Sequence, residues 1–429
     1  MGDEKMKKED KKYGLYLQIL KEELIPAMGC TEPIAMAYAA AKARAVLGAM
    51  PEKIDIVISG NIIKNVKSVI VPNTGNLKGI TAAIAAGVAV GNADKALEVL
   101  ADVKEEDIHL ISEFMEKCDM TVAKAESGKL LDIDLTMYAG SDRVRLRIAD
   151  FHTNIVLIEK NGEVLLSKES SSGSGSGTDR SILNIRDIID FAENVDIADV
   201  QDMLDKQVEY NYAISEEGLK NDYGASVGKT LISTRGDDIR VKARAQAAAG
   251  SDARMSGCEM PVVIVSGSGN QGMTASLPVI VYAKELGVSH EKLLRALVVS
   301  NLVTIHQKTP IGTLSAFCGA ISAGCGAAAG VAWILDGSYE AVSATITNTL
   351  GMISGTVCDG AKPSCATKIA SAVEAGLLGF DLYQNGKGLR GGDGILKDDV
   401  EKTILSVGQL AREGMHETDS EILDIMLDD

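Results

Sequence analysis

The spacing of apolar residues along the chain changes twice, and this predicts an α+β protein. Residues Tyr13 to Leu24 carry apolar side chains at helical spacing. Between residues 50 and 168 short alternating apolar runs are frequent, which is typical of strands. From Ser181 to about Asp428 the spacing is helical almost everywhere. We therefore expect a small mixed α/β-sheet domain followed by a larger all-α C-terminal domain.

The sheet region is expected to contain two groups of strands with helices between them. Lys53–Pro72 predicts short strands around a turn at Gly60-Asn61. Gly79–Ala93 predicts a helix of small residues, and a charged helical stretch follows to about Lys124. Alternating apolar residues return between Leu130 and Lys168, which predicts further strands.

A Ser/Gly-rich segment gives the clearest domain boundary, because its composition is that of a flexible linker. The expected organisation is a charged tail at 1–12, N-terminal helices at 13–49, an α+β domain at 50–168, the linker at 169–179, and an all-α domain at 180–429.

Composition excludes several classes of function. The chain has 429 residues, which is too long for one ordinary core. Its net charge of −17 argues against nucleic acid and against an anionic membrane surface as partners. The N-terminal twelve residues have no apolar stretch, so they are not a secretory signal. Seven scattered cysteines, an odd number, fit a reducing compartment. We expect a cytoplasmic protein that forms a homo-oligomer, a dimer.

One segment is similar to a dinucleotide-binding fingerprint. Val262–Gly272 predicts a strand, a G-x-G-x-x-G turn and a helix. The fingerprint also needs a second strand that ends in an acidic residue, whereas Ser289–Val299 predicts a helix. A better use of the turn is a helix N-terminus whose amides, around Gly269, Asn270 and Gln271, bind a carboxylate. A plain turn between helices is the alternative.

An uncharged run from Thr309 to Leu335 is long enough to span a bilayer. It also contains the small-residue spacing Gly326-x-x-x-Gly330 that is found in packed membrane helices. The run is mostly Ala, Gly and Ser, and Gly319 and Gly324 would weaken an isolated helix. These features favour a buried central helix of a soluble bundle.

Three cysteines near this run suggest a metal site. Cys318 stands at the head of the uncharged run, and Cys358 and Cys365 flank the turn-forming sequence Asp-Gly-Ala-Lys-Pro-Ser. A loop of this kind can direct both thiols at one point. With Cys318 they would hold three corners of an iron–sulfur cubane and leave the fourth iron open for substrate. Zinc on the same residues is the alternative metal, with a fourth protein ligand or a water.

Two further residues are candidates for chemistry. Cys30 precedes a predicted helix whose N-cap is Thr31, and a helix N-terminus favours a thiolate. The alternative is a small buried residue at a helix start. His152 lies between two predicted strands, where a structural role is the alternative. The remaining cysteines are read as small buried residues: Cys118, Cys258 and Cys325.

Four separated motifs resemble the L-cysteine desulfidase family, which is also catalogued as an uncharacterised serine-dehydratase-alpha-like family. They are Gly29-Cys-Thr-Glu-Pro33, Ser266–Gly272, Leu314–Gly319 and Cys358–Cys365, and the resemblance runs from about residue 13 to about residue 415. The C-terminal part also resembles the α domain of iron–sulfur L-serine dehydratases. Those enzymes place more residues between the last two cysteines than this chain does.

The resemblance implies an α,β-elimination that converts L-cysteine to pyruvate, ammonia and sulfide with a [4Fe-4S] cluster on Cys318, Cys358 and Cys365. By analogy Cys30 is the base that removes the Cα proton; the alternative makes Cys30 a cluster ligand. Lys308 and His152 are further candidates for polar contacts with the amino-acid substrate. The same elimination from L-serine or a related amino acid stays open, as does a non-catalytic iron–sulfur or redox sensor.

Overall fold

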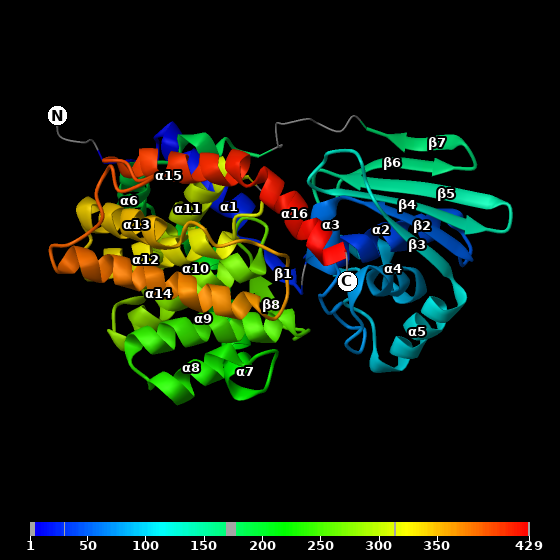
Figure 1. The fold of residues 1–429 in the computed structure, drawn as a ribbon, viewed down its shortest axis with the longest axis horizontal. Helices are drawn as coiled ribbons and strands as arrows, with labels where there is room; N and C mark the ends of the chain where they lie inside the picture. Colours follow the sequence, from blue (N-terminus) through cyan, green and yellow to red (C-terminus); the bar gives the residue numbers. More distant parts are fainter. Residues whose placement is uncertain (1–4, 30, 169–176, 313–314, 428–429) are drawn as a thin grey trace.

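Two hydrophobic cores divide the protein, one formed by helices alone and one between helices and a sheet (Figure 1). The computed structural model describes residues 5–29, 31–168, 177–312 and 315–427. Helices predominate and the sheet is small and mixed, so the predicted α+β fold class is confirmed.

The helical core is built around helices rich in small residues. α12 (Gly319–Leu335) packs against α10, α11, α13 and α14, and its residues are almost all buried. This is the buried central helix that the uncharged run predicts. The other helices of this part are α6 Ile185–Asn194, α7 Ile197–Lys220, α8 Val227–Arg235, α9 Ile239–Met255, α10 Gly269–Glu285, α11 His290–Ile311, α13 Tyr339–Ile353, α14 Cys365–Gln384, α15 Val400–Gln409 and α16 His416–Leu427.

The sheet formed by the described residues has the strand order β3-β2-β4-β5-β6-β7. β2 pairs with β3 in parallel, and the other neighbours are antiparallel. Every second residue of the central strands points to one face of the sheet and is buried, for example Ile56, Leu135 and Leu146. These side chains pack with residues of α2 and α4 in the second core. The bounds are β2 Lys53–Ile58, β3 Asp119–Lys124, β4 Asp132–Ala139, β5 Asp142–Ala149, β6 Ile155–Lys160, β7 Glu163–Ser167, α2 Thr31–Leu47, α4 Gly79–Val90 and α5 Ile108–Lys117.

Two predicted elements of the sheet domain were wrong. The expected turn at Gly60-Asn61 and the strand after it are instead helix α3 (Gly60–Val66). Ile62, Ile63 and Val66 are all buried, and this spacing fits a helix. The charged segment that was expected to be helical to Lys124 ends in the strand β3, which is largely exposed and pairs beside β2.

The chain crosses repeatedly between the two cores. α1 (Lys11–Glu23) belongs to the helical core and α2 to the sheet core, so the N-terminal segment expected at 13–49 is divided between them. β1 (Pro26–Met28), which connects them, pairs antiparallel with β8 (Pro261–Val263), the strand expected before the G-x-G-x-x-G turn. The last helix, α16, leaves the helical part and lies beside α3 (Figure 1), where Leu423 enters the second core.

Glycine lets the backbones of α2 and α4 approach closely. A Cβ added at Gly87 of α4 would lie 2.1 Å from the carbonyl oxygen of Ala37 in α2. Backbone atoms cannot move aside as a flexible side chain can, so this contact requires glycine. Gly14 in α1 has no atom within 4 Å of the corresponding position and is exposed.

Replacing these two glycines by alanine is expected to have opposite effects on stability. Gly87→Ala should lower the free energy of unfolding by about 1–3 kcal/mol, the usual cost of overpacking. Gly14→Ala should raise it by up to about 1 kcal/mol, because alanine is the better helix former. Chemical denaturation of both variants measures the difference, and a Gly87→Ala protein as stable as the wild type would contradict the packing described here.

Candidate functional site

A short backbone pairing brings Cys318 and Cys358 together. Phe317 and Val357 form an isolated antiparallel bridge. The amide of Cys318 donates to the carbonyl of Thr356 at 3.1 Å, and the amide of Cys358 donates to the carbonyl of Ala316 at 2.6 Å. Cys318 is also the N-cap residue of α12. The bridge therefore joins the start of the central helix to the loop that carries Cys358.

Cys365 reaches the same place from the other end of that loop. It is the first residue of α14, and its Sγ lies 3.6 Å from the carbonyl oxygen of Gly360. Gly360 has φ +92°, and a Cβ there would lie 2.0 Å from the carbonyl oxygen of Lys64 in α3. Only glycine fits this turn. The loop thus bends back as predicted and is held against the sheet domain.

The environment of these thiols disfavours the thiolate in the absence of a bound cation. Burial, followed by the negative charge that Cys358 can carry, raises the pKa of Cys318 to about 12. Burial also raises the pKa of Cys365, and Cys358 adds to the effect. All the cysteines of the described residues are free thiols. Because the three thiols influence one another's charge, they form a single electrostatic group.

Two lysines place positive charge beside this group. Lys308, in α11, is 7% exposed; burial lowers its pKa to about 8, and negative charge at Cys358 and Cys318 acts in the opposite direction. Burial also acts to lower the pKa of Lys368, but the Asp359 carboxylate outweighs it and raises that pKa. Lys368 and Asp359 form an ion pair. Among the described residues Lys308 has no carboxylate in ion-pair contact.

The N-terminus of α10 lies against the thiol group. Ser268 caps the helix by accepting from the amide of Gln271 at 3.4 Å. Gln271 is buried, and a Cβ added at Gly319 would lie 2.6 Å from its Cδ, so its side chain packs beside the residue that follows Cys318. The side-chain oxygen of Gln271 is buried and has no hydrogen-bond partner. The structure therefore brings the turn with Gly269, Asn270 and Gln271 next to Cys318.

Among the described residues His152 is not joined to this group. His152 lies in the connection between β5 and β6, and its Nε2 is buried without a hydrogen-bond partner. Within the described part of the chain no hydrogen bond or ion pair links His152 to the cysteines. Cys30 lies outside the described residues. α2 begins at Thr31, the residue predicted as its N-cap.

Arg254 is a site residue that the sequence interpretation missed. It lies near the end of α9 and is 5% exposed. Its Nη2 donates to the carbonyl of Gly29 at 2.6 Å, and its Nη1 lies 3.5 Å from Oδ1 of Asn270. The only signal in the sequence is an arginine within the small-residue run Ala247–Met255. That signal does not reveal whether the side chain points inward.

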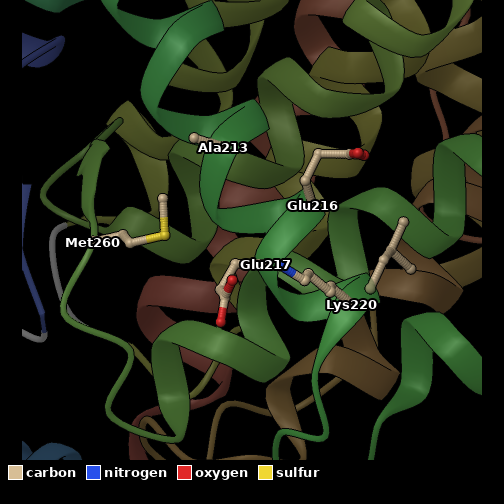
Figure 2. A pocket seen from close by; sticks show the side chains of 6 residues that line it. Ala213, Glu216, Glu217, Lys220 and Met260 are labelled. Carbon is tan, nitrogen blue, oxygen red and sulfur yellow. The ribbon is translucent and has the colours of Figure 1, made fainter.

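A surface pocket of the described residues lies elsewhere. It has a volume of about 460 Å³ and lies along the C-terminal half of α7, beside Met260 (Figure 2). Glu216 and Lys220 line this pocket and are exposed. None of the predicted site residues lines it.

Among the described residues no group of three or more His, Cys, Asp or Glu side chains converges as the ligands of one metal ion would. In the same part of the chain, no helix is both long and apolar enough to cross a membrane.

Fold and site together define an α+β protein that gathers thiols at the N-termini of two central helices. The chain belongs to the serine dehydratase alpha chain family, whose model matches residues 94–424. The UPF0597 protein of Desulfitobacterium hafniense (strain Y51) is 56% identical over 423 residues, covering 98% of each chain. The UPF0597 protein of Treponema denticola is 51% identical over 425 residues, covering 97% of this chain and 99% of the relative.

These similarities confirm the predicted resemblance to a serine-dehydratase-alpha-like family. The family indicates a serine dehydratase-like enzyme of the lyase type. The names of the relatives specify neither a substrate nor a cluster. The cytoplasmic location and the homo-oligomer stay predictions.

Lys308 gives a test of the site's electrostatics in the cluster-free protein. Below its folded pKa of about 8, Lys308 is charged in the folded and unfolded states, so the full cost of burying the charge is present near neutral pH. Lys308→Met should therefore raise the free energy of unfolding there by a few kcal/mol, at about 1.4 kcal/mol per pKa unit. As pH rises from about 8 towards 10.5, the folded wild type loses the proton that the unfolded chain keeps. The advantage of the variant should then shrink.

Urea unfolding across this pH range measures the effect. Lys402→Met, at an exposed lysine of α15, is the matched control and should leave stability nearly unchanged at every pH. A Lys308→Met protein that is less stable than the wild type near neutral pH would show that Lys308 is held by contacts stronger than its desolvation cost.

Proposed function

We propose that this protein is an α,β-eliminating amino-acid lyase, an L-cysteine desulfidase, that uses a [4Fe-4S] cluster. The observation that carries the proposal is the grouping of Cys318, Cys358 and Cys365. They come from the start of α12, a loop and the start of α14, and negative charge at Cys358 acts to raise the pKa of both Cys318 and Cys365. The serine dehydratase-like family supports the same class of reaction.

The residues present fit an iron–sulfur cluster. A cluster binds each thiolate through a different iron, so its ligands need not converge on one point as the ligands of a single ion do. Cys318 is buried, Cys358 and Cys365 are partly buried, and all three are free thiols next to the positive charges of Lys308 and Lys368. Burial raises the pKa of Cys318 and Cys365, so a bound cation is needed to draw off their protons near neutral pH. Cys318, Cys358 and Cys365 would hold the cluster.

When bound, a cluster with an open iron supplies a Lewis acid for a poor leaving group such as sulfide or hydroxide. The chain supplies binding and proton transfer. The amides at the start of α10 and the positive charge of Lys308 favour the carboxylate end of an amino acid. Cys30, from the segment before α2, removes the Cα proton. We place Cys30 in this role rather than among the ligands, because three other thiols are already grouped.

The overall reaction balances with water as the only co-reactant. Loss of the Cα proton and cleavage of the Cβ–sulfur bond convert L-cysteine to aminoacrylate and hydrogen sulfide. Aminoacrylate takes up a proton at Cβ to give an imine, and water hydrolyses the imine to pyruvate and ammonia. No external oxidant or reductant is required.

The second candidate is the same elimination from L-serine, which the family name favours. Anaerobic assay of pyruvate release against L-cysteine, L-serine and other β-substituted amino acids decides between them. The higher kcat/KM identifies the substrate. A coloured protein that releases pyruvate from none of them would refute the lyase and leave an iron–sulfur or redox sensor.

The ligand assignment predicts which cysteines retain iron. Serine at Cys318, Cys358 or Cys365 should remove most of the iron and acid-labile sulfide from anaerobically reconstituted protein, because a neutral serine hydroxyl is a poor replacement for a thiolate ligand. The control variants at Cys118 and Cys325, which are buried elsewhere, should keep their iron. Full iron in all three ligand variants would disprove the assignment.

The role of Cys30 predicts a different result for Cys30→Ser. This variant should keep the cluster and its colour but lose about 10²- to 10⁴-fold in turnover, the usual contribution of a positioned acid–base group. Exchange of the substrate Cα proton with deuterated solvent should fall with turnover. A colourless Cys30→Ser protein would identify Cys30 as a ligand, and a coloured, fully active one would move the base elsewhere.

A further inference from the structure

Arg254 is a buried cation that lacks a carboxylate partner in the described part of the chain. It is 5% exposed, and its Nε is buried without a hydrogen-bond acceptor. Its recorded hydrogen bonds go to neutral oxygens, the carbonyl of Gly29 and the side chain of Asn270. Removing a guanidinium from water is unfavourable unless an anion compensates its charge. The described residues do not supply that anion.

Other arginines of the same helix show the contrast. Arg240 forms an ion pair with Asp381, and Arg244 forms one with Glu374 at 3.0 Å. Both pairs join α9 to α14 and are more exposed than Arg254. The unpaired charge is thus confined to the end of the helix, where α9 meets the proposed site.

Arg254 lies against the first turn of α10. A Cβ added at Gly269 would lie 2.4 Å from Nε of Arg254, so the glycine backbone packs directly on the guanidinium. The amides of Gly269 and Asn270 belong to the first turn of the helix and have no acceptor within it. A helix N-terminus and a guanidinium both favour a carboxylate, and arginine can bind its two oxygens together.

The same turn also contacts the residue that follows Cys318. Gln271 packs on Gly319, which follows Cys318, and is two residues beyond Gly269. Two residues of α-helix rise by about 3 Å, a length comparable to that of a three-carbon amino acid. The first turn of α10 thus contacts both a cation suited to a carboxylate and the residue next to Cys318, a thiol suited to a metal that acts on Cβ.

We propose that Arg254 binds the α-carboxylate of the substrate, together with the free amides of the first turn of α10. The anion that compensates the buried guanidinium is then the substrate itself, and the site selects free amino acids over their amides and esters. This inference rests on the proposed function, because it assigns the orientation of the substrate of that reaction.

The first test measures binding without turnover. L-alanine carries the α-carboxylate but no leaving group, and L-alaninamide lacks the negative charge. Calorimetry on the reconstituted protein should detect L-alanine and show at least about tenfold weaker binding of L-alaninamide, as expected for loss of a hydrogen bond between charged groups. Equal affinity for both, or no binding of L-alanine, overturns the proposal.

Variants then identify the residue. Arg254→Gln keeps an N–H donor for the Gly29 carbonyl but removes the charge, so affinity for L-alanine should fall by about 10- to 100-fold. Affinity for L-alaninamide should change little, a difference that a merely structural role would not produce. Arg244→Gln, whose arginine pairs with Glu374, is the control and should bind as the wild type does. Wild-type affinity in the Arg254→Gln protein overturns the proposal.

A variant that keeps the charge covers the case in which Arg254→Gln does not fold. Arg254→Lys cannot make the forked contact with two carboxylate oxygens, so it should bind L-alanine more weakly than the wild type and L-alaninamide equally. Unchanged affinity for L-alanine overturns the proposal.

Failure of this inference can be told from failure of the proposed function. Binding of L-alanine through Arg254 without elimination from any amino acid would refute only the function. Elimination with an unchanged KM in the Arg254→Gln protein would refute only the role of Arg254.

Discussion

The site depends on one backbone pairing, the bridge between Phe317 and Val357. Two hydrogen bonds join the start of the central helix to a loop more than a helix away in sequence, and they fix Cys318 beside Cys358. The bridge holds its place because both of its sides are anchored. α12 is buried among four other helices, and the loop is pinned where Gly360 touches the backbone of Lys64. The thiols therefore lie where the helical part meets the sheet domain.

Two cations at this place lie beside neutral or anion-binding groups instead of carboxylates. Several other buried or half-buried cations have carboxylate partners, such as Arg147 with Asp132 and Lys64 with Asp419. Lys308 and Arg254 lie beside thiols and a helix N-terminus instead. A buried charge without a counter-ion lowers the stability of the folded state, and proteins keep such destabilising groups mainly at functional sites. The arrangement suits an anionic metal group and an anionic substrate together.

The sequence predicted the features that local patterns encode. Strict alternation identified β4 to β7, and the turn residues between Cys358 and Cys365 identified a loop that bends back. α3 was predicted wrongly because its short apolar run fits the residue spacing of a strand as well as that of a helix. β3 was predicted wrongly because most of its side chains are exposed, so it lacks the apolar alternation of a half-buried strand. Arg254 was missed because burial of an arginine, and the lack of a counter-ion, depend on long-range packing. The sequence drew attention to Cys318, Cys358, Cys365 and Lys308, whose roles stay predictions, whereas it did not point to Arg254 or Lys368.

The short helix α3 explains how the parts of the site are held relative to one another. Its Asn65 donates to Glu32 in the first turn of α2, the helix that follows Cys30, at 3.2 Å. The Lys64 carbonyl touches the loop between Cys358 and Cys365, and the Lys64 ammonium pairs with Asp419 of the last helix. In an elimination, one group must remove the Cα proton while another takes the leaving group from Cβ. Here the proposed groups come from segments attached to different cores, and α3 contacts the described neighbours of both, the first turn of α2 and the loop between Cys358 and Cys365.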